Sequence, residues 1–209
     1  MRWWAVAVTG WASSGCIPFV IPPGQASAGA ATTGSASKKG PEDDAEGNYS
    51  MRAAVHPLGL LDEQHRRTFD FGAGYAVERV ARREGQLFAQ GPYVEVAAYP
   101  WRTRTGNWIA RGGVRTSVDT LISDEGWGEA GYGGSVALAF ELASFAKGAF
   151  VEGGGGDGVA GVAFGEGGIG AFAGVSHRRF ADDAYWLGSA GVSLRIPAAA
   201  GVFCCLRPR

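Results

Sequence analysis

Residues 132–143 read YGGSVALAFELA, and this stretch decides the fold because its side chains alternate between two kinds. The even positions, apart from Gly134, carry large apolar or aromatic side chains: Tyr132, Val136, Leu138, Phe140 and Leu142. The odd positions carry Gly, Ser and Ala, with Glu141 as the single charge. Successive side chains of a β-strand point to opposite faces. The stretch therefore predicts a strand with one face of large apolar side chains, here called the oily face, and one face of small side chains, here called the less oily face.

Similar period-two patterns recur between turn-rich breaks, at residues 49–56, 67–78, 93–101, 108–121, 158–166, 168–178, 185–196 and 201–206. Strict alternation with such breaks is typical of antiparallel sheets. Most segments have about 9 to 13 residues, which exceeds the globular mode of about 5–6 and resembles the 9–11 of membrane-spanning strands. We predict an all-β protein, a closed antiparallel up-and-down β-barrel of about 8–10 strands.

The composition excludes some classes of protein. The chain has 209 residues, of which 46% are hydrophobic and 19% are charged, so it is not disordered as a whole. The formal net charge is −1 and no basic stripe is present, which gives no reason to expect a nucleic-acid partner. Lys147 is the one lysine after residue 39, although soluble sheets commonly place lysine on edges and outer faces.

Two architectures fit strands with these two faces. In a soluble barrel the oily face points inward, whereas in a membrane barrel it points outward and the other face lines the lumen. The small residues on the second face suit a narrow lumen, and the scarcity of lysine also favours the membrane. Aromatic residues near predicted strand ends resemble interfacial girdles; they are Tyr93, Trp101, Trp108, Trp127, Tyr132, Tyr185 and Trp186.

The alternation of large apolar and small residues over residues 49–206 resembles the strand pattern of the small outer-membrane β-barrels of Gram-negative bacteria. The resemblance implies a non-enzymatic structural, envelope-assembly or minor transport role, with membrane lipid as partner, envelope proteins as further candidates and no cofactor. Members of that group usually end on an aromatic residue, whereas here Phe203 is followed by CCLRPR. Two alternatives remain open: a periplasmic lipoprotein whose soluble barrel binds an apolar ligand, and an outer-membrane enzyme that modifies lipids.

The N-terminal segment has the layout of an export signal, with Arg2, an apolar run and then small residues. Ser14-Gly15-Cys16 resembles the lipobox of bacterial lipoproteins, which implies a signal peptide over residues 1–15 and a lipid on Cys16. The alternative is cleavage after Ala26-Ser27-Ala28, an ordinary A-x-A site.

The segment after the signal is poor in large apolar residues. We predict a flexible tether over residues 16–48, whose part GQASAGAATTG is alternatively a small-residue strand, and a barrel domain over residues 49–209.

The charged residues on the less oily faces of neighbouring strands can form pairs of opposite charge inside the barrel. A hairpin of residues 108–121 and 131–143 has a register that places Arg111 opposite Glu141. The hairpin formed by residues 93–101 and 108–121 has a register that places Glu95 opposite Arg115 on the same face. We therefore predict a lumenal network of Glu95, Arg111, Arg115 and Glu141, with Val136, Leu138, Phe140 and Leu142 facing lipid. A barrel of this size predicts a closed or very narrow lumen rather than a general pore.

Signs of catalysis or metal binding are weak. Ser176, His177, Asp182 and Asp183 contain the residue types of acyl-transfer chemistry, but neighbouring side chains on a strand point to opposite faces. The glycine-rich stretch at 152–158 offers two carboxylates for calcium and is more typical of a turn. Cys204-Cys205 lacks the spacing of zinc ligands, and we expect either two small strand residues or a disulfide. We predict no catalytic residue and no metal ligand.

Overall fold

The computed structural model describes residues 16–35, 48–61, 68–82, 85–124, 129–152, 158–180 and 184–204. Its strands are β1 (Cys16–Ile21), β2 (Gly24–Ser35), β3 (Tyr49–Val55), β4 (Phe69–Arg82), β5 (Gly85–Thr105), β6 (Trp108–Ser123), β7 (Ala130–Glu152), β8 (Gly158–Arg179), β9 (Ala184–Ile196) and β10 (Ala198–Cys204). A short 3₁₀ turn, η1 (Pro57–Leu60), follows β3. Within the described part of the chain, no helix has the length and apolarity needed to cross a bilayer.

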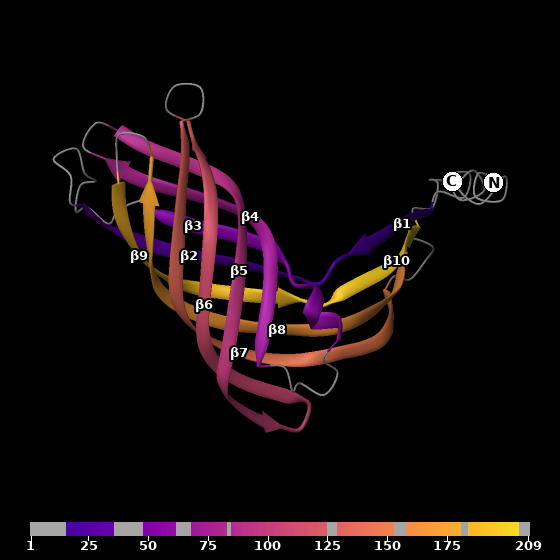
Figure 1. Ribbon diagram of the computed structural model, residues 1–209. Helices are drawn as coiled ribbons and strands as arrows, with labels where there is room; N and C mark the ends of the chain where they lie inside the picture. Colours follow the sequence, from indigo (N-terminus) through magenta and orange to yellow (C-terminus); the bar gives the residue numbers. More distant parts are fainter. Residues whose placement is uncertain are drawn as a thin grey trace.

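Eight of these strands close into a barrel (Figure 1). Strands β2 to β9 follow one another around the wall, each antiparallel to its neighbours, and β2 pairs with β9 to close the circle. The predicted all-β fold, a closed antiparallel up-and-down barrel, is confirmed. Closure pairs the edges of the sheet and so removes the open hydrogen-bonding groups of an edge strand.

The oily face of β7 points outward. Leu138 is 69% exposed and Phe140 is 50% exposed, whereas Glu141 between the outward residues is 3% exposed. Val136 and Leu142 also lie on the outer face. The small residues of β7 and Glu141 therefore face the lumen, and its large apolar residues form the outer surface.

The sheet extends beyond the barrel at the end where β3 leads into η1. There β1 pairs with β10, and β10 pairs with residues 158–164 at the start of β8. The same part of β8 pairs with the last part of β7. Figure 1 shows β1 and β10 running away from the barrel. We call these four segments the projecting sheet. Residues 158–166 and 168–178, predicted as two strands, are therefore one long strand, β8.

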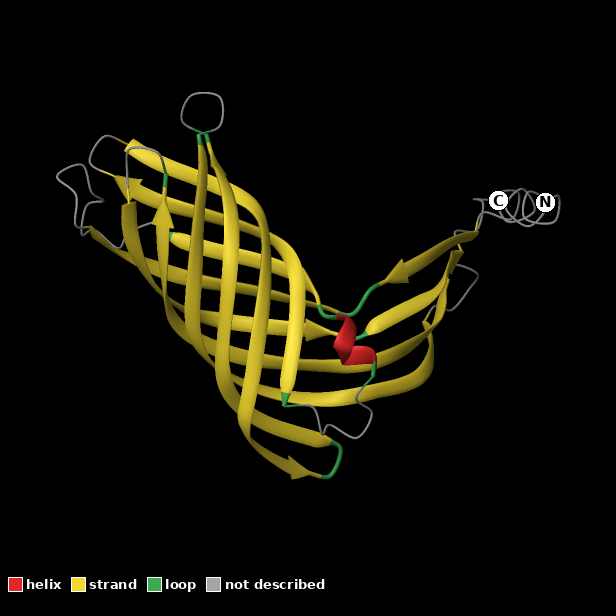
Figure 2. Ribbon diagram, in the orientation of Figure 1, coloured by secondary structure: helices red, strands yellow, loops and turns green. Residues whose placement is uncertain are grey.

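The projecting sheet leaves the barrel at a local irregularity. Gly165 has a φ of +111°, which L side chains rarely adopt, and Pro197 interrupts the opposite strand between β9 and β10. The η1 turn lies at this point (Figure 2), where the carbonyl of Gly59 leaves little room above Gly165. The glycine and proline together let the chain bend away from the barrel without clashing with η1.

The segment predicted as a tether differs from the expectation. Residues 24–35 form β2, the strand that closes the barrel between β3 and β9, so the alternative of a small-residue strand describes them. Residues 16–21 form β1 of the projecting sheet. The predicted signal peptide, residues 1–15, lies outside the described residues.

Candidate functional site

Charged side chains fill the lumen in two clusters. The upper cluster, toward the β8–β9 connection, contains Arg52, Glu78, Asp119 and Arg178. The lower cluster, toward η1, contains His56, Asp70, Glu95, Arg111, Arg115, Glu141, Glu166 and Arg195. Apart from Arg52, which is half-buried, all of these residues are buried. Charges so placed are tolerated only where opposite charges and hydrogen bonds compensate for lost water.

Glu141 is the centre of the lower cluster. Nη2 of Arg111 donates to its Oε2 at 2.8 Å, and Nη2 of Arg115 donates to its Oε1 at 2.9 Å. The Tyr99 hydroxyl also donates to Oε1, at 2.9 Å. Nε2 of Gln25 donates to Oε1 at 3.0 Å, and Nη2 of Arg195 lies 3.4 Å from Oε2. One carboxylate thus connects three guanidinium groups that come from β6 and β9.

Arg111 connects Glu141 to a second carboxylate. Its Nη1 and Nη2 donate to the two oxygens of Glu166 at 3.1 and 3.0 Å. Its guanidinium also lies over the ring of Tyr99, 4.4 Å from the centroid, so one face of the cation is covered. Because each contact uses a different edge or face of one planar group, Arg111 holds β6, β7 and β8 in a fixed register.

The upper cluster is built around Arg178. Its Nε donates to Oε2 of Glu78 at 2.8 Å, and its Nη1 lies 3.0 Å from Oδ2 of Asp119. Arg52 reaches Oδ1 of the same Asp119 from β3, also at 3.0 Å. The guanidinium of Arg52 lies over the ring of Tyr93, 4.8 Å from its centroid. The cluster therefore connects β3, β4, β6 and β8 across the lumen.

The lumen is closed rather than open. Above the upper cluster lies a buried apolar plug, which consists of Ala31, Val80, Leu87, Ala89, Leu121, Phe180, Tyr185 and Leu187. Between the clusters lies a void of about 40 Å³, lined in part by Ser27, Glu95, Arg115 and Ser176. A space of this size holds no more than a few water molecules. The expectation of a closed or very narrow lumen agrees with this filling.

His56 lies at the lower end of the lumen, after β3 and before η1. Its Nδ1 is 3.1 Å from Oδ2 of Asp70, and its Nε2 is 2.9 Å from Oε1 of Glu95. The second contact is close but poorly aligned as a hydrogen bond, and it becomes an ion pair when the imidazole is protonated. Burial lowers the pKa of His56, but the two carboxylates more than offset this effect, and the pKa is raised above its ordinary value.

The predicted network is placed in the lumen, with one register as expected and one different. Arg111 lies directly opposite Glu141. Glu95 lies opposite Ser117, and Arg115 lies opposite Ala97, so the predicted register that pairs Glu95 with Arg115 is wrong by two residues. The observed turn lies at Gly106 and Asn107, where Thr105 pairs with Trp108, and this shifts the register by three residues from the predicted one. A one-residue bulge between Ala98 and Trp101 then reduces the difference to two. Glu95 therefore pairs with His56.

Sequence reasoning missed several members of the clusters. Asp70, Asp119 and Arg195 occupy positions of the less oily face, so their alternation already indicated the lumen. Their partners were not predictable because they come from distant strands. Arg195, for example, reaches Oδ2 of Asp70 at 2.6 Å across the barrel.

The outer wall carries aromatic residues at two levels. Tyr132 and Trp186 lie near the upper ends of β7 and β9 and are 61% and 53% exposed. Trp101 and Trp108 flank the lower β5–β6 turn, and each is 50% exposed. Other residues predicted for these girdles differ: Tyr93 and Tyr185 are buried in the lumen, and Trp127 lies outside the described residues.

Cys16 is disulfide-bonded, and in the ladder it lies opposite Cys204. A lipid-modified cysteine carries its diacylglycerol on the same sulfur, so one sulfur cannot carry both groups. The predicted lipid on Cys16 conflicts with this bond. Cleavage after Ala28 conflicts with the barrel, because it would cut β2 in the middle of its pairings with β3 and β9.

Of the candidate catalytic residues, the structure describes Ser176 and His177 and places them on opposite faces of β8. Ser176 faces the lumen and is buried, whereas His177 lies on the outer face with its ring 4.8 Å from that of Trp186. Asp182, Asp183 and residues 153–157 lie outside the described residues, as does Cys205. Within the described ranges, no group of three or more His, Cys, Asp or Glu side chains is arranged to hold a metal ion.

Comparison with known proteins gives no further identification. No protein-family model matches the chain, and no curated protein matches its sequence.

Proposed function

We propose that this protein is an exported, non-enzymatic β-barrel of the bacterial outer membrane, with a closed lumen and a structural role in the envelope. One observation carries the proposal: along the middle of the wall the large apolar side chains point outward, while paired charges fill the lumen below the apolar plug. The apolar face of β7 runs from Tyr132 to Leu142, and a strand of this length, tilted by 35–45°, covers roughly 23–27 Å. The apolar band of outer-membrane barrels is about 25 Å tall.

The structural role follows from what fills the lumen. The apolar plug and the two charged clusters fill most of the lumen between the described strands, which argues against passage of a solute. Paired charges that connect opposite strands also make the barrel rigid. We propose that it serves as a fixed platform in the membrane for the projecting sheet, which offers exposed Ile17, Val20 and Phe203 to an envelope partner.

The proposal is tested with Leu138→Arg. Arginine near the middle of the bilayer destabilises a membrane barrel by about 2–4 kcal/mol, whereas near the interface the effect falls to about 0–1 kcal/mol. The matched control is Thr120→Arg, an outward position of β6 that lies opposite Tyr132 near the upper girdle. We expect the wild type to stay with membranes after alkaline carbonate extraction, and Leu138→Arg to lower the free energy of unfolding in vesicles far more than Thr120→Arg.

The opposite results would contradict the proposal. A soluble barrel would be recovered without detergent, and Leu138→Arg would leave its stability unchanged or improve its solubility.

A further inference from the structure

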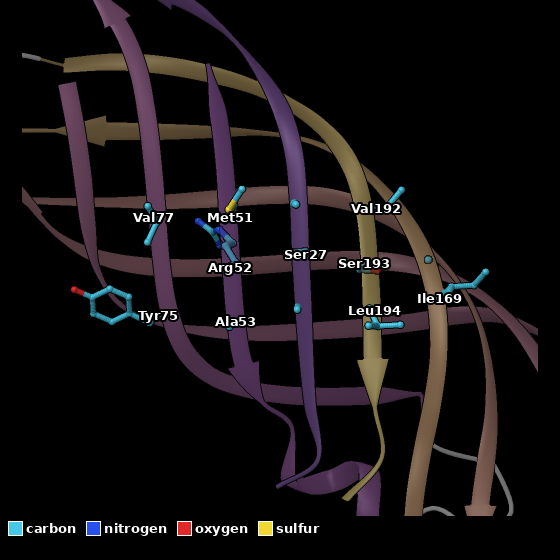
Figure 3. A pocket seen from close by; sticks show the side chains of 13 residues that line it. Ser27, Met51, Arg52, Ala53, Tyr75, Val77, Ile169, Val192, Ser193 and Leu194 are labelled. Carbon is cyan, nitrogen blue, oxygen red and sulfur yellow. The ribbon is translucent and has the colours of Figure 1, made fainter. Parts of the chain in front are cut away.

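An apolar groove of about 740 Å³ runs along the outer wall of the barrel where β2 lies between β3 and β9. Figure 3 shows its lining, in which Met51 and Tyr75 lie to one side of β2 and Val192, Leu194 and Ile169 to the other. The groove lies within the part of the wall that the proposed function places in the membrane.

The strand register explains why this part of the wall is hollow. In the ladder, Ala26 lies between Ala53 and Leu194, and the next outward residue of β2, Ala28, lies between Met51 and Val192. Alanine on the central strand provides a low floor, and the long side chains of the flanking strands form the walls. Met51, Val192 and Leu194 are each at least half exposed, so no other part of the described chain covers them.

A cationic group lies one row beyond the upper end of the groove. The next outward residue of β2 is Ala30, which lies opposite Tyr49, and Tyr49 in turn lies opposite Arg79 of β4. Nε of Arg79 donates to Oε1 of Gln86 at 3.0 Å. The two Nη groups carry four more N–H donors in the planar arrangement that suits phosphate oxygens.

We infer that this groove binds one acyl chain of a phospholipid, whose phosphate is held by Arg79. The inference rests on the proposed function, since it needs the wall to lie in a bilayer. From the groove floor at Ala26 to the row of Ala30 and Arg79 the distance along the strand is about 13 Å. A tilt of 35–45° reduces this to roughly 9–11 Å of depth, within the roughly 15 Å of one leaflet. The guanidinium near the upper end of β4 then lies at the level of the headgroups, and the apolar groove lies below it.

The occupant is a lipid rather than a water-soluble ligand because of the chemistry of the lining. Ser27, Arg52 and Ser193 also line the groove, but they belong to the lumenal face of their strands, where Arg52 pairs with Asp119. The outward-facing side chains of the lining are apolar, apart from the Tyr75 hydroxyl. An acyl chain gains contact with alanine, methionine and branched side chains on three sides, and the only charge complementarity it requires is at its headgroup.

The experiment is native mass spectrometry of the full chain released from vesicles of phosphatidylethanolamine and phosphatidylglycerol. Ala28→Phe fills the groove, and Ala53→Leu narrows it from the neighbouring strand. The matched control is Ala173→Phe, an outward alanine of β8 that does not line the groove. We expect the wild type and Ala173→Phe to retain one phospholipid, and both groove variants to lose about tenfold or more of this binding.

Arg79→Gln tests the headgroup contact. Loss of a hydrogen-bonded ion pair to phosphate should weaken phospholipid retention about tenfold or more while leaving retention of uncharged diacylglycerol unchanged. If wild type, Ala28→Phe and Ala53→Leu stay in the membrane and retain phospholipid equally, the lipid site is overturned and the proposed function is not. If the wild type is a dimer and Ala28→Phe is a monomer, the groove binds a second copy of the chain and the lipid site is overturned. Recovery of the protein without membrane would instead contradict the proposed function.

Discussion

Arg111 on β6 lies directly opposite Glu141 on β7, and its Nε and Nη2 both donate to the same carboxylate oxygen, at 3.0 and 2.8 Å. The pair is buried in the lumen, and Glu141 is shared with Arg115 and Arg195. This pairing fixes the register of the hairpin whose outer face carries Leu138 and Phe140. A slip of one residue would turn the charges toward the outside and the apolar side chains inward.

Replacement of Arg111 should destabilise the barrel strongly. Arg111→Met leaves Glu141 and Glu166 short of a partner in a lumen with little water, which costs about 3–5 kcal/mol. The control is Arg104→Met, an exposed arginine of β5 whose loss should change stability by less than about 0.5 kcal/mol. Urea unfolding of the refolded barrel in detergent gives both values.

The coupling of Arg111 and Glu141 is measured by a charge reversal. Arg111→Glu should lower the free energy of unfolding, and addition of Glu141→Arg should restore part of the loss. The restoration is incomplete because an arginine at position 141 meets Arg115 and Arg195. A double variant whose loss equals the sum of the two single losses would show that the pair is not energetically coupled.

His56 should make stability depend on pH. Its pKa in the folded protein is raised by Asp70 and Glu95 against burial and the nearby Arg195. A raised pKa means that the contribution of His56 is fully present below its ordinary pKa of about 6.5 and is lost as the pH rises through the folded-state value. The difference in free energy of unfolding between wild type and His56→Gln should therefore shrink between acid and alkaline pH. A constant difference would contradict this.

The closed lumen predicts an absence of channel activity. Purified protein in planar bilayers should show no stable single-channel conductance, because the apolar plug and the charged clusters fill the interior. An open porin reconstituted in parallel shows that the assay detects channels. Large and steady conductance steps from the wild type would be incompatible with the lumen described above.

The state of Cys16 can be decided by intact mass. The disulfide predicts a mature protein whose Cys16 resists alkylation until it is reduced and that carries no diacylglycerol. Cys16→Ser should then abolish the reduction-dependent change in mass, and neither protein should incorporate an alkyne fatty acid. Incorporation by the wild type but not by Cys16→Ser would instead support lipid modification.

The sequence alone determined the class of fold, because the period of two is a local property of each strand. Residues 132–143 show which side chains share a face, and the turn-rich breaks indicate antiparallel neighbours. The same alternation located Arg111 and Glu141 on one face of a hairpin. A short connection leaves few possible registers, which is why this pair was predictable.

Only the tertiary structure decided which face is outside and which charges meet. Both faces of a strand are compatible with either side of a barrel until the wall closes. The contact of Arg195 with Asp70, or of Arg178 with Glu78, joins strands far apart in the sequence, and no local pattern encodes such a distance. Glu95 lies opposite Ser117 because the hairpin turn lies at Gly106 and Asn107, beyond its predicted position. A bulge between Ala98 and Trp101 adjusts that register by one residue, and the projecting sheet begins at Gly165. Both are single-residue departures from a regular ladder, and their effect appears only when neighbouring strands are in place.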